Sequence, residues 1–350
     1  MEFWSKEVFF THKETFTIMS HTYLIITSIA DQYHQILKQF AKECKEKNIF
    51  YIVIGDSKSP TDFNIEGCDY YSIEHQLKLD FELAKKLPLN HYARKNIGYL
   101  IAISKGAQII IETDDDNIPL KEFWNPRNKQ VKAHLINNSD WVNVYKYFTS
   151  ANIWPRGFAL ENIYRSIPAL DAQQDIECPI QQGLADENPD VDAIYRLTNS
   201  LPVKFEFGNN IALGNNTICP FNSQNTTWFN EAFPLLYLPS YCSFRMTDIW
   251  RSFVAQRIAW SCGWSILFHQ CSVKQERNEH NLMFDFKDEI VGYTNNLNIC
   301  NSLKEMNLDE GIINIPNNMI QCYQKLVELG LVDTREIALL KAWLKDIKKD

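Results

Sequence analysis

Three consecutive aspartates, Asp114, Asp115 and Asp116, directly follow the apolar run 107–112 and Thr113. Alternate aspartates at the end of a buried strand point into the same cavity, so Asp114 and Asp116 are placed to hold Mn²⁺ or Mg²⁺ through carboxylate oxygens. Such an ion can bridge the two phosphates of a nucleotide sugar and neutralise the leaving diphosphate. A solvated acidic turn is the alternative. We favour the metal because three adjacent carboxylates repel one another without a cation.

Four residues on other segments are candidates for holding the organic part and the phosphates of such a ligand. Arg94 and Lys95 lie in the first turns of a predicted helix and are suited to a diphosphate or nucleoside, or else form a solvated basic face. Thr27 ends the first predicted strand. Asp56 follows the second, where it can accept a hydrogen bond from a base imide or serve as a turn residue in GDSKSP. Asp115 is expected to contact the ribose or the donor sugar.

A later polar segment, 275–281, carries two further candidates. His280 can be a third metal ligand through its imidazole, and Arg277 can neutralise phosphate. A lone histidine is more often a hydrogen-bonded core or surface residue, and that alternative stays open.

The segment Trp154-Pro155-Arg156-Gly157 combines a ring, a rigid turn and a cation. A sugar face can stack on Trp154 while Arg156 touches phosphate or hydroxyl groups, and an ordinary turn is the alternative.

Three aspartates, Asp190, Asp192 and Asp248, are candidates for binding sugar hydroxyls or for general base catalysis. Asp248 is the preferred base if the reaction inverts configuration, and it positions substrate if the reaction retains it. It also reads as the N-cap of the helix predicted over 249–260.

The elements that carry these residues alternate between strand and helix. Segments rich in strand-forming residues at 23–29, 50–54 and 107–112 predict buried strands, and helical spacing fills the segments between them. This order predicts an α/β fold with a mainly parallel sheet flanked by helices, whose ligands bind at the carboxyl ends of the strands. Residues 120–245 look loop-rich, and the pattern from 285 onwards is helical. We therefore expect an N-terminal extension (1–20), one catalytic domain (21–284) and a helical C-terminal extension (285–350).

Composition excludes several classes of protein. The 350 residues carry a formal net charge of −8, which has the wrong sign for nucleic acid or an anionic membrane. The nine cysteines include no C-x-x-C pair, which favours reduced thiols in a cytoplasmic protein. No apolar run approaches the ~20 residues of a membrane helix, and the N-terminus does not resemble a signal peptide. Dinucleotide, P-loop, hydrolase-elbow and zinc-helix motifs do not occur.

Most of the chain resembles the STELLO family of glycosyltransferase-like proteins. The resemblance covers roughly 50–290 and rests on these segments, in the expected order: YIVIGDSKSPTDF, ARKNIGYLIAISKGAQIIIETDDDNIP, CPFNSQNTTWFN, TDIWRSFVAQRIAW and SVKQERNEHN. Arg251, within TDIWR, joins the candidates for binding the donor. The plant members are Golgi membrane proteins associated with cellulose synthase assembly. The sequence shows no segment that resembles their anchor, so we do not expect their location and partners to carry over.

Short segments, DDD and WPRG, are also similar to the reversibly glycosylated polypeptides, which are UDP-arabinopyranose mutases. That resemblance implies that Arg156 contacts the sugar or is itself glycosylated. Both families imply a GT-A-like nucleotide-sugar fold with a D-x-D metal site.

The leading hypothesis is a metal-dependent glycosyltransferase that uses a nucleotide-diphosphate sugar, above all a UDP-sugar, and a glycan or other hydroxyl acceptor in cell-surface polysaccharide synthesis. The alternatives are a nucleotide-sugar mutase and a non-catalytic scaffold of a polysaccharide synthase. The acidic triplet argues against the scaffold because a pure scaffold has no need of its electrostatic cost. A homo-oligomer is compatible with the aromatic-rich C-terminal half.

Overall fold

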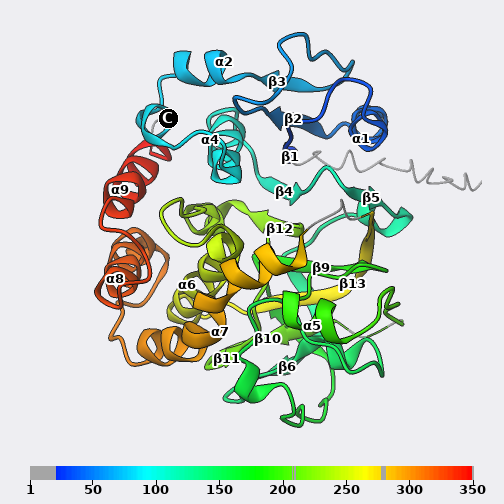
Figure 1. The fold of residues 1–350 in the computed structure, drawn as a ribbon. Helices are drawn as coiled ribbons and strands as arrows, with labels where there is room; N and C mark the ends of the chain where they lie inside the picture. The colour runs from blue at the N-terminus through cyan, green and yellow to red at the C-terminus, as the bar shows by residue number, and fades with distance from the viewer. Residues whose placement is uncertain (1–20, 207, 209, 277–280, 349–350) are drawn as a thin grey trace, which may run out of the picture.

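The computed structural model, drawn in Figure 1, describes residues 21–206, 208, 210–276 and 281–348. The predicted extension 1–20, Arg277 and His280 lie outside these residues. Within them, no helix is both long enough and apolar enough to cross a bilayer.

Four parallel strands form the N-terminal part of the sheet, in the order β3-β2-β1-β4. Their bounds are β1 (Thr22–Thr27), β2 (Phe50–Ile54), β3 (Asp69–Tyr71) and β4 (Ile109–Thr113). Side chains alternate across a strand, and here both faces are buried. Leu24 and Ile26 pack with Leu37 and Phe40 of α1, while Ile25 packs in the core that holds α4. The predicted doubly buried strands are therefore confirmed.

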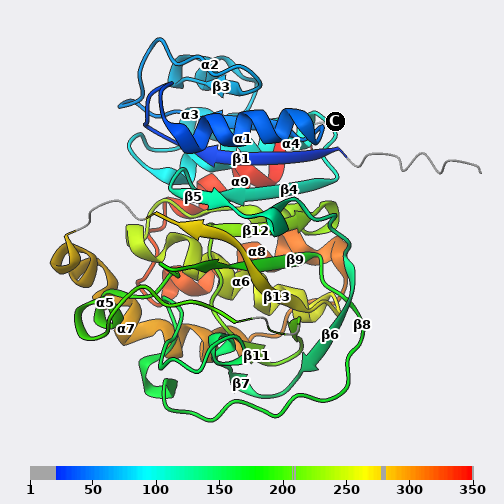
Figure 2. The same ribbon diagram turned by 90° about the vertical axis from the view of Figure 1, so that its right-hand side faces the viewer.

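Helices cover both faces of this part of the sheet, with α1 on one side and α4 on the other (Figure 2). The helices of this half are α1 (Gln35–Glu46), α2 (Ile73–Lys78), α3 (Glu82–Lys86) and α4 (Lys95–Ser104), and η1 (Tyr92–Arg94) leads into α4. The α/β class with flanking helices is confirmed.

The sheet continues beyond β4 as a mixed one, in the order β12-β9-β13-β10-β6-β8. Strand β12 runs antiparallel to both β4 and β9, and parallel pairs (β9 with β13, β6 with β10) alternate with antiparallel ones. The region that looked loop-rich thus supplies much of the sheet. The strands are β5 (Asn117–Pro119), β6 (Gln130–Ile136), β7 (Asp140–Trp141), β8 (Gln174–Glu177), β9 (Ile180–Asp186), β10 (Ile211–Leu213), β11 (Thr217–Ile218), β12 (Asn225–Phe229) and β13 (Ile266–Gln275).

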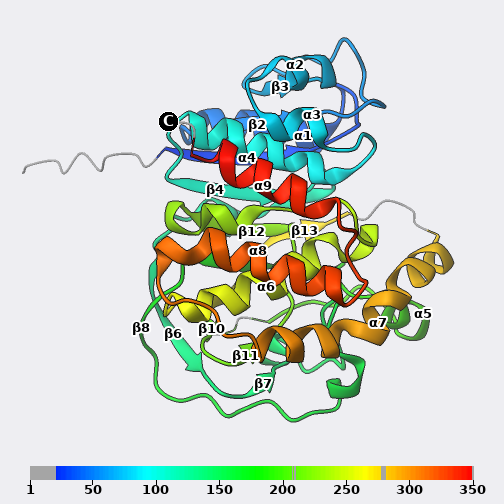
Figure 3. The ribbon, with the colours of Figure 1, turned by 90° about the vertical axis from the view of Figure 1, so that its left-hand side faces the viewer.

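Long helices pack on one face of the mixed part, with α6, α7 and α8 in front of the sheet in Figure 3. The remaining helices are α5 (Ala193–Thr198), α6 (Thr247–Ser261), α7 (Leu282–Lys304), α8 (Ile315–Glu328) and α9 (Glu336–Asp346), with short 3₁₀ turns η2 (Lys121–Trp124), η3 (Val144–Tyr147), η4 (Leu160–Asn162), η5 (Asn230–Leu236), η6 (Phe244–Met246) and η7 (Ile312–Asn314).

The helical character of the C-terminal region is confirmed, and this region shares its core with the sheet. Trp343 of α9 is fully buried with its ring 6.4 Å from that of Tyr99 in α4 and 5.9 Å from that of Tyr237. Helix α9 also lies beside α3, where the Asp346 carboxylate accepts a hydrogen bond from the backbone N–H of Leu83 at 2.8 Å.

Candidate active site

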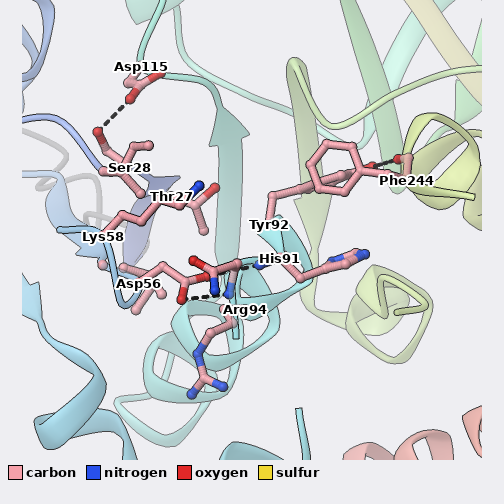
Figure 4. A pocket seen from close by; sticks show the side chains of 13 residues that line it. Thr27, Ser28, Asp56, Lys58, His91, Tyr92, Arg94, Asp115 and Phe244 are labelled. Atoms are coloured by element: carbon pink, nitrogen blue, oxygen red, sulfur yellow. Dashed lines mark hydrogen bonds between the residues drawn. The ribbon is translucent and has the colours of Figure 1, made fainter. Parts of the chain in front are cut away.

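The polar turns after β1, β2 and β4 meet at one edge of the sheet, because the carboxyl ends of parallel strands lie on the same side. They open onto a hollow of about 730 Å³ that includes space open to solvent, which we call the rim hollow. Its wall is made by Thr27, Ser28, Ile29, Ile54, Gly55, Asp56, Lys58, Asn90, His91, Tyr92, Arg94, Asp115 and Phe244 (Figure 4).

A second, more polar space adjoins the rim hollow and shares Thr27, Tyr92, Asp115 and Phe244 with it. We call it the acidic hollow. It is lined by all three aspartates of the triplet and by Arg156, Asp190, Arg196, Ser223, Gln224, Arg245, Asp248 and Gln275. The predicted convergence of the triplet with other polar residues on one rim is therefore seen.

Each aspartate of the triplet has a different partner. Asp114 Oδ1 is 2.9 Å from the Lys95 ammonium, and Asp115 accepts a short hydrogen bond from the Ser28 hydroxyl. Asp116 Oδ2 accepts a hydrogen bond from the Gln275 side chain at 3.0 Å. Asp116 Oδ1 is buried and has no hydrogen-bond partner. A buried carboxylate oxygen without a partner is costly, so this atom needs a cation or a ligand.

The electrostatics of the triplet agree with this need. Burial, together with the Asp114 and Asp115 carboxylates, raises the pKa of Asp116 to about 7. Burial also raises the pKa of Asp114, although Lys95 opposes that rise. Two carboxylates with raised pKa values that line one hollow fit a hard divalent cation, which would stabilise both in the ionised form.

Asp114 and Asp116 are the predicted metal ligands that fall within the described residues. Among residues 21–206, 208, 210–276 and 281–348, no group of three or more histidine, cysteine, aspartate or glutamate side chains is arranged to hold a metal. An ion on Asp114 and Asp116 would therefore keep positions open for a ligand and water. His280, the predicted third ligand, lies outside the described residues, as does Arg277.

Lys95 and Arg94 do not present their charges to the hollows, which corrects the expectation that both contact a diphosphate. The Lys95 side chain is fully buried and donates to the carbonyls of Thr113 (2.9 Å) and Ser223 (3.4 Å) besides Asp114. Lys95 therefore holds the triplet in place.

The Arg94 guanidinium points away from the rim hollow, as Figure 4 shows. Its Nε donates to Gln76 at 2.7 Å, and its terminal nitrogens donate to the carbonyls of Leu87 and Ala84 at 3.2 and 3.3 Å. The Arg94 guanidinium thus stabilises the segment that precedes α4. The part of Arg94 that lines the rim hollow is the remainder of the residue and not the guanidinium.

Asp56 lies in the wall of the rim hollow, but its carboxylate binds backbone N–H groups. Its two oxygens accept hydrogen bonds from the N–H groups of Asn90 and His91 at 2.9 and 3.0 Å. This contact ties the turn after β2 to η1 and matches the turn-residue alternative rather than base recognition.

Arg156 is 6% exposed and lies between two carboxylates. Its Nε and Nη2 are each 2.8 Å from Asp190, and its Nη1 and Nη2 are 3.1 and 2.9 Å from Asp248. The following Gly157 has φ = +84°, and a Cβ there would lie 2.3 Å from Ile249. Only glycine fits this turn, which fixes the direction in which Arg156 enters the site.

The surroundings of Asp248 make it a weak proton acceptor. Burial alone would raise its pKa, but Arg156 and other donors lower the pKa to about 2. Besides Arg156, Asp248 accepts hydrogen bonds from the Ser223 N–H at 3.2 Å and the Tyr92 hydroxyl at 3.3 Å. Asp248 therefore anchors Arg156 as a fixed anion, which favours the positioning alternative, and its role as general base stays a prediction. It lies inside the first turn of α6, which begins at Thr247, rather than at the N-cap.

Asp192, Arg251 and Trp154 are structural, which corrects their assignment to ligand binding. Asp192 caps α5 through the Tyr195 N–H (2.7 Å) and accepts a hydrogen bond from the Trp154 indole at 2.7 Å. Arg251 is 1% exposed and pairs with Glu112 of β4 at 2.8 Å. None of the three lines either hollow.

Several lining residues escaped sequence reasoning. The rings of His91, Tyr92 and Phe244 lie within 4.8–5.5 Å of one another at the rim hollow, and Lys58 is an exposed cation in its wall. Gln275 was noted in its segment without a role. Phe244 stands just before TDIWR, and the N–H of Ser223 lies within PFNSQNT. Both segments are distinctive in the sequence, and that distinctiveness was the signal that could have pointed to Phe244 and Ser223 as lining residues.

The chain resembles known proteins in sequence. The sequence model described as STELLO glycosyltransferases matches residues 245–350. Two Arabidopsis thaliana proteins, "Probable glycosyltransferase STELLO2" and "Probable glycosyltransferase STELLO1", are each 30% identical over 260 and 234 residues, which is 68% and 61% of this chain. The chain belongs to the STELLO family. It spans 34% and 30% of the length of these two relatives.

Solved structures resemble the chain more distantly. Glucosyl-3-phosphoglycerate synthase from Mycobacterium tuberculosis, solved with Mn²⁺ and UDP-glucose, aligns over 82% of this chain and 79% of its own, with a TM-score of 0.39 and 9% identity. The mannosyltransferase PcManGT from Pyrobaculum calidifontis, solved with GDP-mannose and Mn²⁺, aligns over 95% and 89%, with a TM-score of 0.39 and 8% identity.

Proposed function

We propose that the chain is a metal-dependent glycosyltransferase of the GT-A type that transfers a sugar from a nucleotide diphosphate to a hydroxyl acceptor. The observation that carries this proposal is the unpartnered, buried Oδ1 of Asp116 beside Asp114, at the carboxyl end of β4, where both residues line the acidic hollow. The family's description and the names of the two relatives support the same class of activity.

Asp114 and Asp116 would hold Mn²⁺ or Mg²⁺. When bound, the ion supplies positive charge that stabilises the leaving diphosphate. The protein's part is to keep both carboxylates fixed: Lys95 holds Asp114, Gln275 holds Asp116, and Ser28 holds Asp115. Side chains held in this way lose no conformational freedom when the ligand binds.

The rim hollow would take the nucleoside of the donor. The rings of His91, Tyr92 and Phe244 offer apolar surface to a base, and the exposed Lys58 offers a charge to the phosphates. Burial lowers the pKa of His91 to about 4, so its ring is neutral at physiological pH and does not attract phosphate.

The acidic hollow would take the transferred sugar and the acceptor. Arg156 is preorganised there by Asp190 and Asp248, and Asp248 serves as a positioning residue that keeps the guanidinium in one orientation. Hydroxyl groups suit this hollow because its wall is dominated by amide, guanidinium and carboxylate groups.

The test is calorimetric titration of the whole chain with UDP and with GDP, with and without Mn²⁺. We expect binding of at least one nucleotide that depends on the metal, and loss of that dependence in the Asp114→Ala/Asp116→Ala double variant. Asp62→Asn, at an exposed acid away from the hollows, is the matched control and should bind as the wild type does. The proposal fails if the wild type binds no nucleotide in either condition.

Product analysis with a panel of nucleotide sugars separates transfer from isomerisation. A transferase releases nucleoside diphosphate and lengthens an acceptor, whereas a mutase rearranges the donor without an acceptor. A role in polysaccharide synthesis and a cytoplasmic location stay predictions from the sequence.

A further inference from the structure

A third polar groove lies outside the candidate active site, on the face of the mixed sheet that lacks long helices. In Figure 2 the strands β6, β9 and β13 stand in front of α6 and α8, and Figure 3 shows those helices on the opposite face. The groove encloses about 1200 Å³ that includes open solvent, and it shares no lining residue with the rim hollow or the acidic hollow.

A local irregularity in β13 helps to form this groove. The pairing of β13 with β9 shifts register between His269 and Val273, as at a β-bulge, which turns side chains away from the regular pleat. In β9, opposite the bulge, stands Gly183. A Cβ at Gly183 would lie 2.7 Å from the His269 ring and 2.4 Å from the Asn225 amide, so only glycine leaves room for them.

The main cation of the groove is Arg127, which is held in place without a carboxylate. Its Nη1 donates to the Asn125 carbonyl at 2.6 Å, its Nε donates to the Thr227 hydroxyl at 3.4 Å, and its guanidinium stacks 5.3 Å from the centre of the Phe123 ring. Within the described residues Arg127 has no ion pair, and its Nη2 has no hydrogen-bond partner. The groove thus offers an oriented guanidinium edge with its charge uncompensated.

The surroundings of Arg127 also favour an anionic ligand. Arg127 is half-buried, and partial burial without a neighbouring acid lowers its pKa to about 10. A second cation, the exposed Lys132, lines the same groove, and Glu122 is the only carboxylate in the lining. A bound anion would offset the cost of burying the Arg127 charge.

His269 adds a fixed acceptor next to this cation. Its Nδ1 donates to the Gln270 carbonyl at 2.9 Å, which leaves Nε2 as the acceptor of a neutral ring. Burial and the nearby Arg127 lower the pKa of His269 to about 4, so the ring stays neutral at physiological pH. A neutral imidazole accepts hydrogen bonds from hydroxyl groups. Amide side chains, among them Gln181 and Gln270, line the rest of the groove and suit hydroxyl groups equally well.

We propose that this groove is a second binding site, separate from the candidate active site, for a hydroxyl-rich anion: a sugar acid or a sugar phosphate. The anionic group binds the free edge of Arg127, assisted by Lys132. The sugar hydroxyls donate to His269 Nε2 and exchange hydrogen bonds with the amide side chains. This inference does not depend on the proposed transferase activity, because binding alone is claimed.

The test is calorimetric titration of the whole chain with glucuronate, oligogalacturonate, glucose 6-phosphate, glucose and inorganic phosphate. An excess of nucleoside diphosphate and Mn²⁺ keeps the candidate active site filled, and the Asp114→Ala/Asp116→Ala variant provides a second means of removing that site. We expect saturable binding of at least one of the three acidic saccharides, at least 10-fold tighter than that of glucose or phosphate. The acidic saccharide that binds tells a carboxylate ligand from a phosphate ligand.

Three variants at the groove refine the test. Arg127→Gln should weaken binding of the acidic saccharide at least 10-fold, and His269→Phe should weaken saccharide more than phosphate. Lys42→Gln, at an exposed lysine on α1, should change binding less than 2-fold. If Arg127→Gln does not fold, Lys132→Glu at the exposed end of the groove takes its place and should weaken binding at least 3-fold.

Three outcomes would overturn the proposal: no saturable binding of any acidic saccharide, binding of glucose as tight as that of every acidic saccharide, or unchanged binding in each of the variants Arg127→Gln and Lys132→Glu that folds. Binding that disappears in the Asp114→Ala/Asp116→Ala variant would assign the ligand to the acidic hollow and would overturn it as well. Nucleotide binding is measured separately, so failure here leaves the transferase proposal untouched.

Discussion

Replacing Arg251 by methionine should destabilise the protein strongly and leave nucleotide binding intact. Arg251 is 1% exposed, and its guanidinium contacts both oxygens of Glu112, at 2.8 and 3.0 Å. Glu112 is fully buried and also accepts hydrogen bonds from the Tyr99 hydroxyl and, at 2.8 Å, from the Trp228 indole. Without Arg251, this buried carboxylate loses the one cation that pairs with it among the residues that the structure describes.

The magnitude follows from that geometry. Removing one partner of a buried ion pair costs about 3–5 kcal/mol, because the remaining charge stays out of water without compensation. The Arg251→Met/Glu112→Gln double variant should recover part of this loss, with a coupling energy of about 1–3 kcal/mol. Tyr99 and Trp228 donate to different oxygens of Glu112. In the double variant the glutamine carbonyl can accept from the Trp228 indole while the glutamine amide donates to the Tyr99 hydroxyl, so both side chains keep a partner and the double variant still folds.

Urea unfolding followed by tryptophan fluorescence measures these differences, and calorimetric titration with nucleotide and Mn²⁺ is run on the folded variants. Arg335→Met is the matched control. The Arg335 side chain is 65% exposed beside Asp333, and such surface pairs contribute about 0–1 kcal/mol. Unchanged stability of Arg251→Met together with loss of nucleotide affinity would refute the reasoning and restore Arg251 as a donor ligand.

Three further predictions concern the site and its support. Asp248→Asn should lower turnover on the order of 100-fold, because Arg156 is then held less firmly. Nucleotide affinity should stay within about 3-fold of the wild type, and the pH–rate profile should keep its shape. Loss of the acidic limb of that profile would instead identify Asp248 as the general base. Burial raises the pKa of Asp192 to about 6, above its usual value of 3.8, so the folded state holds this proton more tightly than the unfolded chain. The stability that this group contributes is therefore fully present below pH 3.8 and is lost as pH rises through 6, by about 3 kcal/mol. Asp192→Asn should thus be more harmful at pH 4 than at pH 7.5 in urea titrations, and an equal cost at both pH values would contradict this. Trp343→Ala should cost about 3–5 kcal/mol in a single cooperative unfolding transition, whereas two separate transitions would show that residues 285–350 fold apart from the sheet.

The N-terminal strands and the rim they form were predictable because their signals are local. Strands β1, β2 and β4 are short apolar runs that end in polar turns, and parallel order places those ends together whatever the rest of the chain does. The acidic triplet was recognisable for the same reason, since its position follows from the strand that precedes it.

The pairing of the second half was not predictable from local pattern. Strand β12 enters the sheet between β4 and β9, and its paired residues lie 44–48 positions along the chain from those of β9 and 112–120 from those of β4. Register at such separations depends on the packing of the whole core. A region of short strands joined by long connections therefore reads as loops.

Charged residues gave the largest errors, because one sequence does not say which charges are paired inside the protein. Arg94, Lys95 and Arg251 all look like phosphate ligands by type. The structure instead buries each of them against internal acceptors: the carbonyls of α3, the triplet itself and Glu112. The hydrophobic periodicity of the sequence does not predict these hydrogen-bond partners.

The contact between α9 and α3 has a consequence for synthesis on the ribosome. The hydrogen-bond partner of the Leu83 amide is the Asp346 carboxylate, which lies 263 residues further along the chain. At typical rates of translation this corresponds to roughly 13–50 s during which that amide, and the face of Tyr99 that Trp343 later covers, lack their native partners. The N-terminal half, which carries the acidic triplet, is therefore completed only once α9 has been synthesised, and nascent chains halted before α9 should be held by chaperones.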